Sequence, residues 1–152
     1  MIMKQKIQIL DTTLREGEQT PGVSFKISQK IEIVKLLNQF GVDYIEVGHP
    51  VVSKDIYSFI KKVSKLNINS KLIAHSRLLK KDIDQVIESG IPWIGLFLDF
   101  RKDHLEKKYG INEKKALEMI VDSISYAKKH KLKVRITAED ASRTNPDVLI
   151  EV

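Results

Sequence analysis

The chain has 152 residues and no cysteine; 42% of its residues are hydrophobic, 30% are charged, and the formal net charge is +6. These values indicate one globular domain with a hydrophobic core, and they exclude a disordered polymer, a disulfide framework, a zinc ribbon and a thiolate nucleophile. The apolar runs are too short to span a bilayer and residues 1–10 carry no secretory signal, so we expect a cytoplasmic protein with no membrane partner. No basic run with interleaved aromatic residues predicts nucleic-acid binding.

Short apolar runs alternate with amphipathic helical patterns along the chain. Strands are expected at residues 6–10, 43–48, 71–75, 92–98 and 132–137. Helices are expected over residues 28–40, 53–66 and 80–89, and then from residue 112 to about residue 129. Ser28, Ser53 and Asn112 are expected to cap three of these helices, Gly41 and Gly90 to end two of them, and Pro146 to occupy the first position of a last helix.

This alternation predicts a parallel sheet covered by helices, either a doubly wound open sheet or a (β/α)8 barrel. No glycine-rich phosphate-binding sequence follows the first strand, which argues against the doubly wound type. Polar residues instead follow the ends of successive strands, where barrel enzymes build their sites. A whole barrel needs about 250 residues. We therefore expect residues 1–152 to be a partial catalytic domain, the first five βα units of a TIM barrel without the sixth to eighth strands.

The segment after the first strand, Asp11-Thr-Thr-Leu-Arg-Glu-Gly-Glu-Gln-Thr-Pro-Gly22, places Arg15 beside Glu16 at this end of the sheet. A carboxylate there can hold a hard divalent cation, and a guanidinium can stabilise a developing oxyanion without losing its proton. Considered alone, an Arg-Glu pair of this kind is more often a structural ion pair than a catalytic one.

This segment resembles the conserved motif of the acyl-CoA-dependent Claisen-condensing enzymes, the isopropylmalate, citramalate and homocitrate synthases, which are metal-dependent TIM barrels related to hydroxymethylglutaryl-CoA lyase. Three further segments resemble the archaeal homocitrate synthases of lysine biosynthesis in particular. They are Phe40-Gly-Val-Asp-Tyr-Ile-Glu-Val-Gly-His-Pro50, Ile73-Ala-His-Ser-Arg77 and Val134-Arg-Ile-Thr-Ala-Glu-Asp140.

The resemblance implies roles for seven residues. Glu16 would be a metal ligand, and Arg15 would polarise the keto oxygen and stabilise the enolate of acetyl-CoA. Glu46 and His75 would contribute to the 2-oxoglutarate pocket, Arg135 and Thr137 would hold a carboxylate of that substrate, and His75 and Glu139 would serve the acid–base chemistry. Arg135 and Thr137 are two apart on one strand and therefore share a face.

Other interpretations of these residues stay open at this point. His75 is also compatible with a packed core histidine, and Glu46 with an ion pair to Arg77 or Arg135. A role for His49 at the barrel rim is left undecided. No role is assigned to His104 or His130, and Trp93 and residues 97–100 are expected in the core.

The implied activity is an acyl transfer in which acetyl-CoA and 2-oxoglutarate give homocitrate and CoA. The cofactor would be a divalent metal, magnesium, manganese or zinc, completed by a His-x-His pair that the chain lacks. The expected partners are the missing C-terminal half-barrel or a complementary chain, and a homo-oligomer once the barrel is complete. The alternatives are an isopropylmalate or citramalate synthase, a nitrogen-fixation homocitrate synthase, or an inactive truncated fragment. We expect the isolated chain to be inactive.

Overall fold

A curved parallel sheet organises the computed structural model, which describes residues 7–151. The strands are β1 (Leu10–Asp11), β2 (Tyr44–Glu46), β3 (Lys71–Arg77), β4 (Trp93–Asp99) and β5 (Lys133–Glu139). Each strand pairs in parallel with the strand before it in sequence, giving the order β1-β2-β3-β4-β5. A doubly wound sheet would reverse this order part of the way along, so the expectation of a partial barrel wall is confirmed.

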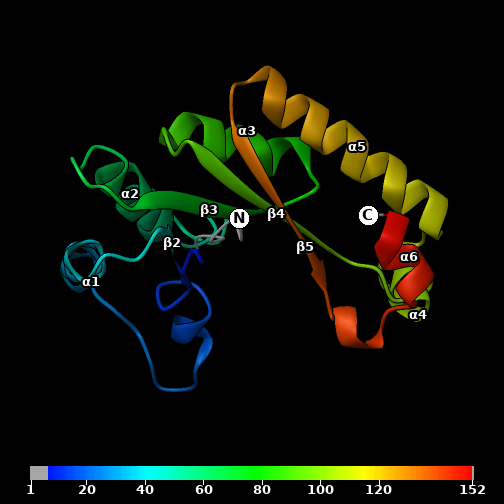
Figure 1. Cartoon of the computed structure of the whole chain (residues 1–152), viewed down its shortest axis with the longest axis horizontal. Helices are drawn as coiled ribbons and strands as arrows, with labels where there is room; N and C mark the ends of the chain where they lie inside the picture. Colours follow the sequence, from blue (N-terminus) through cyan, green and yellow to red (C-terminus); the bar gives the residue numbers. More distant parts are fainter. Residues whose placement is uncertain (1–6, 152) are drawn as a thin grey trace, which may run out of the picture.

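The connecting helices cover one side of this sheet. They are α1 (Ile27–Phe40), α2 (Lys54–Val63), α3 (Lys80–Ser89) and α5 (Glu113–Lys129), and Figure 1 shows them arranged as an arc around the strands. Shorter elements lie near the carboxyl ends of the strands. These are η1 (Gly17–Gln19), α4 (Lys102–His104), η2 (Leu105–Tyr109), η3 (Ala141–Arg143) and α6 (Pro146–Glu151). None of the described helices is long and apolar enough to cross a membrane.

Strand alternation separates the core from the candidate site. Leu72 and Ala74 of β3 and Ile94 and Leu96 of β4 are buried in the hydrophobic core that the helices cover. The intervening residues point to the opposite face, which we call the inner face because it would line the interior of a barrel. Two rows of residues in register cross the inner face. They are His75–Gly95–Arg135 and, one step nearer the carboxyl ends of the strands, Arg77–Phe97–Thr137.

The sequence predicted the N-cap residues of two helices correctly and that of a third wrongly. Ser53 and Asn112 cap α2 and α5 by accepting hydrogen bonds from Ile56 N and Lys115 N, as expected. Ser28 is not a cap, which corrects the expectation. The helix begins one residue earlier, with Lys26 at the N-cap, because the side chain of Gln29 accepts a hydrogen bond from Lys26 N.

Two further expectations are corrected. The first strand is Leu10–Asp11 alone: residues 7–9 are not strand, and residue 6 lies outside the described residues. Trp93 and Phe97 are only partly buried, because both belong to inner-face rows and no helix within residues 7–151 covers that face. Phe100 is buried in the core as expected.

Candidate active site

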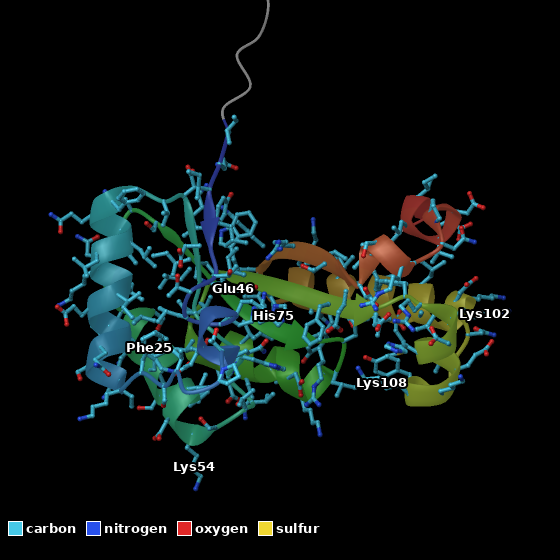
Figure 2. All side chains as sticks on the ribbon, turned by 90° about the horizontal axis from the view of Figure 1, so that it is seen from below. Phe25, Glu46, Lys54, His75, Lys102 and Lys108 are labelled. Carbon is cyan, nitrogen blue, oxygen red and sulfur yellow. The ribbon has the colours of Figure 1, made fainter. Side chains whose placement is uncertain are left out.

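Glu46, the last residue of β2, is the centre of a cluster on the inner face. Its side chain is fully buried, and Arg15 Nε donates a hydrogen bond of 2.7 Å to Oε2. Its other oxygen, Oε1, lies 3.1 Å from His75 Nδ1 and 3.5 Å from Arg135 Nη1. Figure 2 shows Glu46 and His75 next to each other near the middle of the molecule. One carboxylate therefore links β3, β5 and the segment after β1.

Gly95 of β4 leaves open space at the centre of this arrangement. It lies in register between His75 and Arg135, so a side chain here would stand between β3 and β5 on the inner face. A Cβ atom at this position would lie 3.5 Å from His75 Nδ1 and 3.6 Å from Glu46 Oε1. The absence of any larger group leaves the space through which Glu46 reaches Arg135.

The environment keeps Glu46 ionised. Burial by itself raises the pKa of this carboxyl, but the contact with His75, the hydrogen bond from Arg15 and the charges of both groups outweigh burial and lower the pKa from 4.5 to about 2. Glu46 is therefore a fixed anion near neutral pH and is unsuited to exchanging protons with a substrate.

Arg15 and Glu16 lie together at the carboxyl end of β1. The backbone N–H groups of both residues bond to Thr12 O, and the buried side chain of Leu14 anchors this turn in the core. Arg15 Nη1 contacts Glu16 Oε2 while Nε is held by Glu46. The guanidinium is thus oriented from two sides, and the Glu16 side chain remains 58% exposed.

His75, Arg135 and Thr137 supply polar groups that the inner face does not fully pair. Thr137 Oγ1 is buried and has no hydrogen-bond partner among the described residues. His75 Nδ1 is within ion-pair distance of Glu46 but lacks an aligned hydrogen bond within the same residues. The Arg135 side chain is 36% exposed and touches Glu46 only at 3.5 Å. Unpaired buried polar groups are costly, so this set is suited to an anionic ligand that would pair with them.

A second group of residues stands next to this set. The imidazole of His75 is stacked on the ring of Phe97, and His49 lies edge-on to both rings. His49 in turn contacts Asp82, a fully buried carboxylate of α3 that pairs with Arg77. Phe97 was expected in the core and Asp82 was not singled out, because the spacing of residues does not predict contacts between different elements.

Glu139 lies away from the cluster around Glu46. It is exposed at the end of β5 and is in register with Asp99, two residues beyond the row of Phe97 and Thr137. Asp99 is buried and contacts His104 Nδ1, while Arg101 bridges Asp103 and Asp140. The structure therefore brings together Arg15, Glu16, Glu46, His75 and Arg135, with Thr137 one row away.

The described residues do not complete a metal centre. No group of three or more His, Cys, Asp or Glu side chains is placed to hold a metal ion in the part of the chain that the structure describes. Glu16 offers one exposed carboxylate, and a single carboxylate does not make a catalytic divalent site.

Comparison with known proteins agrees with this fold. A family model described as HMGL-like matches residues 6–152; enzymes of this family generally use a divalent metal. Homocitrate synthase of Sulfurisphaera tokodaii is 50% identical over 97% of the chain, and homocitrate synthase of Pyrococcus horikoshii is 49% identical over 90%. The chain spans only 33% and 38% of the length of these two relatives.

Solved structures give the same architecture. The HMG-CoA lyase of Bacillus subtilis superposes with a TM-score of 0.72 at 21% identity, covering 86% of this chain and 45% of that enzyme. The hydroxymethylglutaryl-CoA lyase of Pseudomonas aeruginosa gives 0.72 at 23% identity, with the same coverage of 86% and 45%. At these identities the likeness concerns the fold, and it identifies the five parallel strands as a curled half of a TIM barrel.

Proposed function

This chain belongs to the HMGL-like family, and on that premise we propose that it forms the substrate-binding wall of a homocitrate synthase, which condenses acetyl-CoA with 2-oxoglutarate. In this reaction the acetyl methyl group loses a proton, and the resulting enolate carbon attacks the ketone of 2-oxoglutarate. Hydrolysis of the thioester then releases CoA. The chemistry develops negative charge first on the enolate oxygen and then on an alkoxide, so it needs fixed positive charge beside both.

Arg15 would supply that charge. Its guanidinium is held by Glu46 through Nε and contacts Glu16 through Nη1, so its orientation is set before a substrate binds. A preoriented donor costs no reorganisation when charge develops. In this proposal Glu46 orients Arg15 and bounds the 2-oxoglutarate pocket, while Glu139 at the rim and His75 serve the proton transfers.

The observation that carries the proposal is the incompletely paired polar set of His75, Arg135 and Thr137, in which the first two residues share only Glu46 as a partner. These side chains come from β3 and β5 and face the same interior, with Thr137 Oγ1 buried and unpaired among the described residues. They would bind the carboxylate of 2-oxoglutarate distant from its ketone. An arginine forms paired hydrogen bonds with a carboxylate, which gives specificity as well as affinity.

Glu16 would contribute one ligand to a divalent ion, magnesium, manganese or zinc, with the other ligands outside the described residues. A cytoplasmic location and assembly as a homo-oligomer belong to the same proposal.

The sister synthases that use pyruvate or 2-oxoisovalerate are the competing assignment. Their substrates carry a small or apolar group where 2-oxoglutarate carries its second carboxylate. The inner face carries the polar side chains of His75, Arg135 and Thr137. An apolar group placed against them would leave their hydrogen bonds unmade, so such a substrate would be disfavoured.

Calorimetric titration of the chain with 2-oxoglutarate and with 2-oxoisovalerate tests the proposal. We expect 2-oxoglutarate to bind more tightly, and Arg135→Ala to weaken its binding by about tenfold or more. Arg143→Ala is the matched control, because this arginine is 70% exposed and pairs with Asp140 at the surface. Equal affinity for the two acids, or equal losses in the two variants, would refute the assignment.

A further inference from the structure

The imidazole of His75 is held in a defined plane by aromatic contacts. Its ring lies on the ring of Phe97 with centroids 4.3 Å apart and an angle of 7° between the planes. The ring of His49 stands nearly perpendicular to both, with centroids 6.2 Å from His75 and 6.2 Å from Phe97. Edge-to-face contact of this kind is the favoured geometry for aromatic pairs. His49 therefore closes the side of the stack and limits how far the His75 ring can turn.

His49 lies within ion-pair distance of a buried carboxylate, although its Nε2 atom makes no aligned hydrogen bond among the described residues. Its Nε2 atom lies 3.4 Å from Asp82 Oδ2, and Asp82 is fully buried in the first turn of α3. Arg77 Nε and Nη2 donate hydrogen bonds of 2.6 and 3.2 Å to the two oxygens of Asp82. Arg77 follows His75 by two residues on β3, so these contacts lead from the β2–α2 loop through α3 back to the strand of His75.

The charge state of His49 is consistent with a role in positioning a neighbouring side chain. Burial lowers the pKa of His49, and this effect outweighs the opposing attraction of Asp82. The ring is therefore neutral at pH 7. A neutral imidazole has one N–H to donate, and Nε2 is the ring nitrogen that lies nearer to Asp82.

We propose that His49 is a positioning residue which, packed beside Asp82, holds the ring of His75 against Phe97 and so keeps that ring next to Glu46 and the substrate carboxylate. The link to substrate rests on the proposed function of the inner face. The positioning of the His75 ring is a property of the chain alone and can be measured without any ligand.

Two-dimensional NMR of the histidine ring resonances in the full chain tests the proposal. His49→Ala removes both the edge contact and the contact with Asp82, so we expect the His75 ring signals to shift and broaden. His49→Phe keeps an aromatic edge but loses the contact with Asp82, and should give a smaller change. Asp82→Asn removes the carboxylate charge beside His49 and weakens the ion pair with Arg77, while both rings are retained, and should also perturb His75. His130→Ala is the control, because this histidine packs on Tyr126 at the end of α5.

Binding provides the second measurement. We expect His49→Ala to weaken 2-oxoglutarate binding by about tenfold, the size typical of a lost ordering contact, and His130→Ala to leave it unchanged. Circular dichroism verifies that each variant is folded, and if His49→Ala unfolds, His49→Phe and Asp82→Asn decide the outcome. Unchanged His75 signals in the folded variants would overturn the inference. Failure of the unmodified chain to bind 2-oxoglutarate would instead count against the proposed function, and the ring signals would still decide the role of His49.

Discussion

At Glu46, one fully buried carboxylate contacts Arg15, His75 and Arg135, so its removal would leave Arg135 without its ion-pair partner and Arg15 with Glu16 alone. We expect Glu46→Gln to lower the free energy of unfolding by about 3 kcal/mol, as breaking one side of a buried ion pair does. Urea unfolding measures this change. Glu118→Gln is the control, because the exposed pair of Glu118 with Lys115 should contribute less than about 0.5 kcal/mol. Similar losses in the two variants would contradict the account of Glu46.

The same carboxylate predicts an acid-sensitive contribution to stability. The pKa of Glu46 is lowered from 4.5 to about 2 in the folded chain, so the folded state binds this proton more weakly than the unfolded state. The stabilisation is therefore fully present above pH 4.5 and is lost as the pH falls toward 2, with a total of about 3 kcal/mol. We expect the stability gap between the unmodified chain and Glu46→Gln to narrow from pH 6 to pH 3. A gap that stays constant over this range would contradict the lowered pKa.

At the scale of elements, α5 depends on Asn112, the N-cap residue that precedes it. Asn112 accepts a hydrogen bond of 2.9 Å from Lys115 N and so satisfies one of the open N–H groups at the start of a 17-residue helix. We expect Asn112→Ala to lower the free energy of unfolding by about 1 kcal/mol, and Asn112→Asp to retain the stability because aspartate caps equally well. Thermal and urea unfolding check both values. Unchanged stability in Asn112→Ala would show that packing of α5 against the sheet, and not its cap, fixes the start of the helix.

Elements were more predictable from the sequence than contacts between them. Gly41 and Gly90 adopt positive φ angles of 94° and 81° where helices α1 and α3 end, which glycine alone adopts without strain. Ser28 was wrongly expected to be the cap of α1. The side chain of Gln29 accepts a hydrogen bond from Lys26 N, so Lys26 takes the N-cap position instead of the serine. The α4 and η2 turn after β4 was not predicted, because it has no apolar period of its own.

The candidate site was predictable only in part, because the sequence predicts positions within one strand better than contacts between elements. Alternation placed Arg135 and Thr137 on one face, since it depends only on the period of a strand. The contact of Arg15 with Glu46 joins residues 31 apart in sequence, and it depends on strand register and side-chain reach, neither of which spacing determines. Stacking of Phe97 on His75 depends on the register between β3 and β4 and was missed, and Phe97 was expected in the core instead.

At the scale of the whole molecule, the chain spans 33% of the Sulfurisphaera tokodaii relative, and its described residues group no set of metal ligands. We expect no release of CoA from acetyl-CoA and 2-oxoglutarate by the isolated chain. A thiol reagent measures this cleanly, because the chain contains no cysteine and CoA is the only thiol formed. Saturable CoA release that depends on both substrates would contradict this expectation.

The central claim is that the inner face of the five-stranded sheet binds a 2-oxo dicarboxylate through His75, Arg135 and Thr137. A crystal structure of the chain soaked with 2-oxoglutarate tests it most directly. The account predicts one carboxylate between the guanidinium of Arg135, the ring of His75 and the hydroxyl of Thr137, with the ketone nearer Arg15. Density for the ligand elsewhere on the chain, or with its ketone end against Arg135, would contradict it.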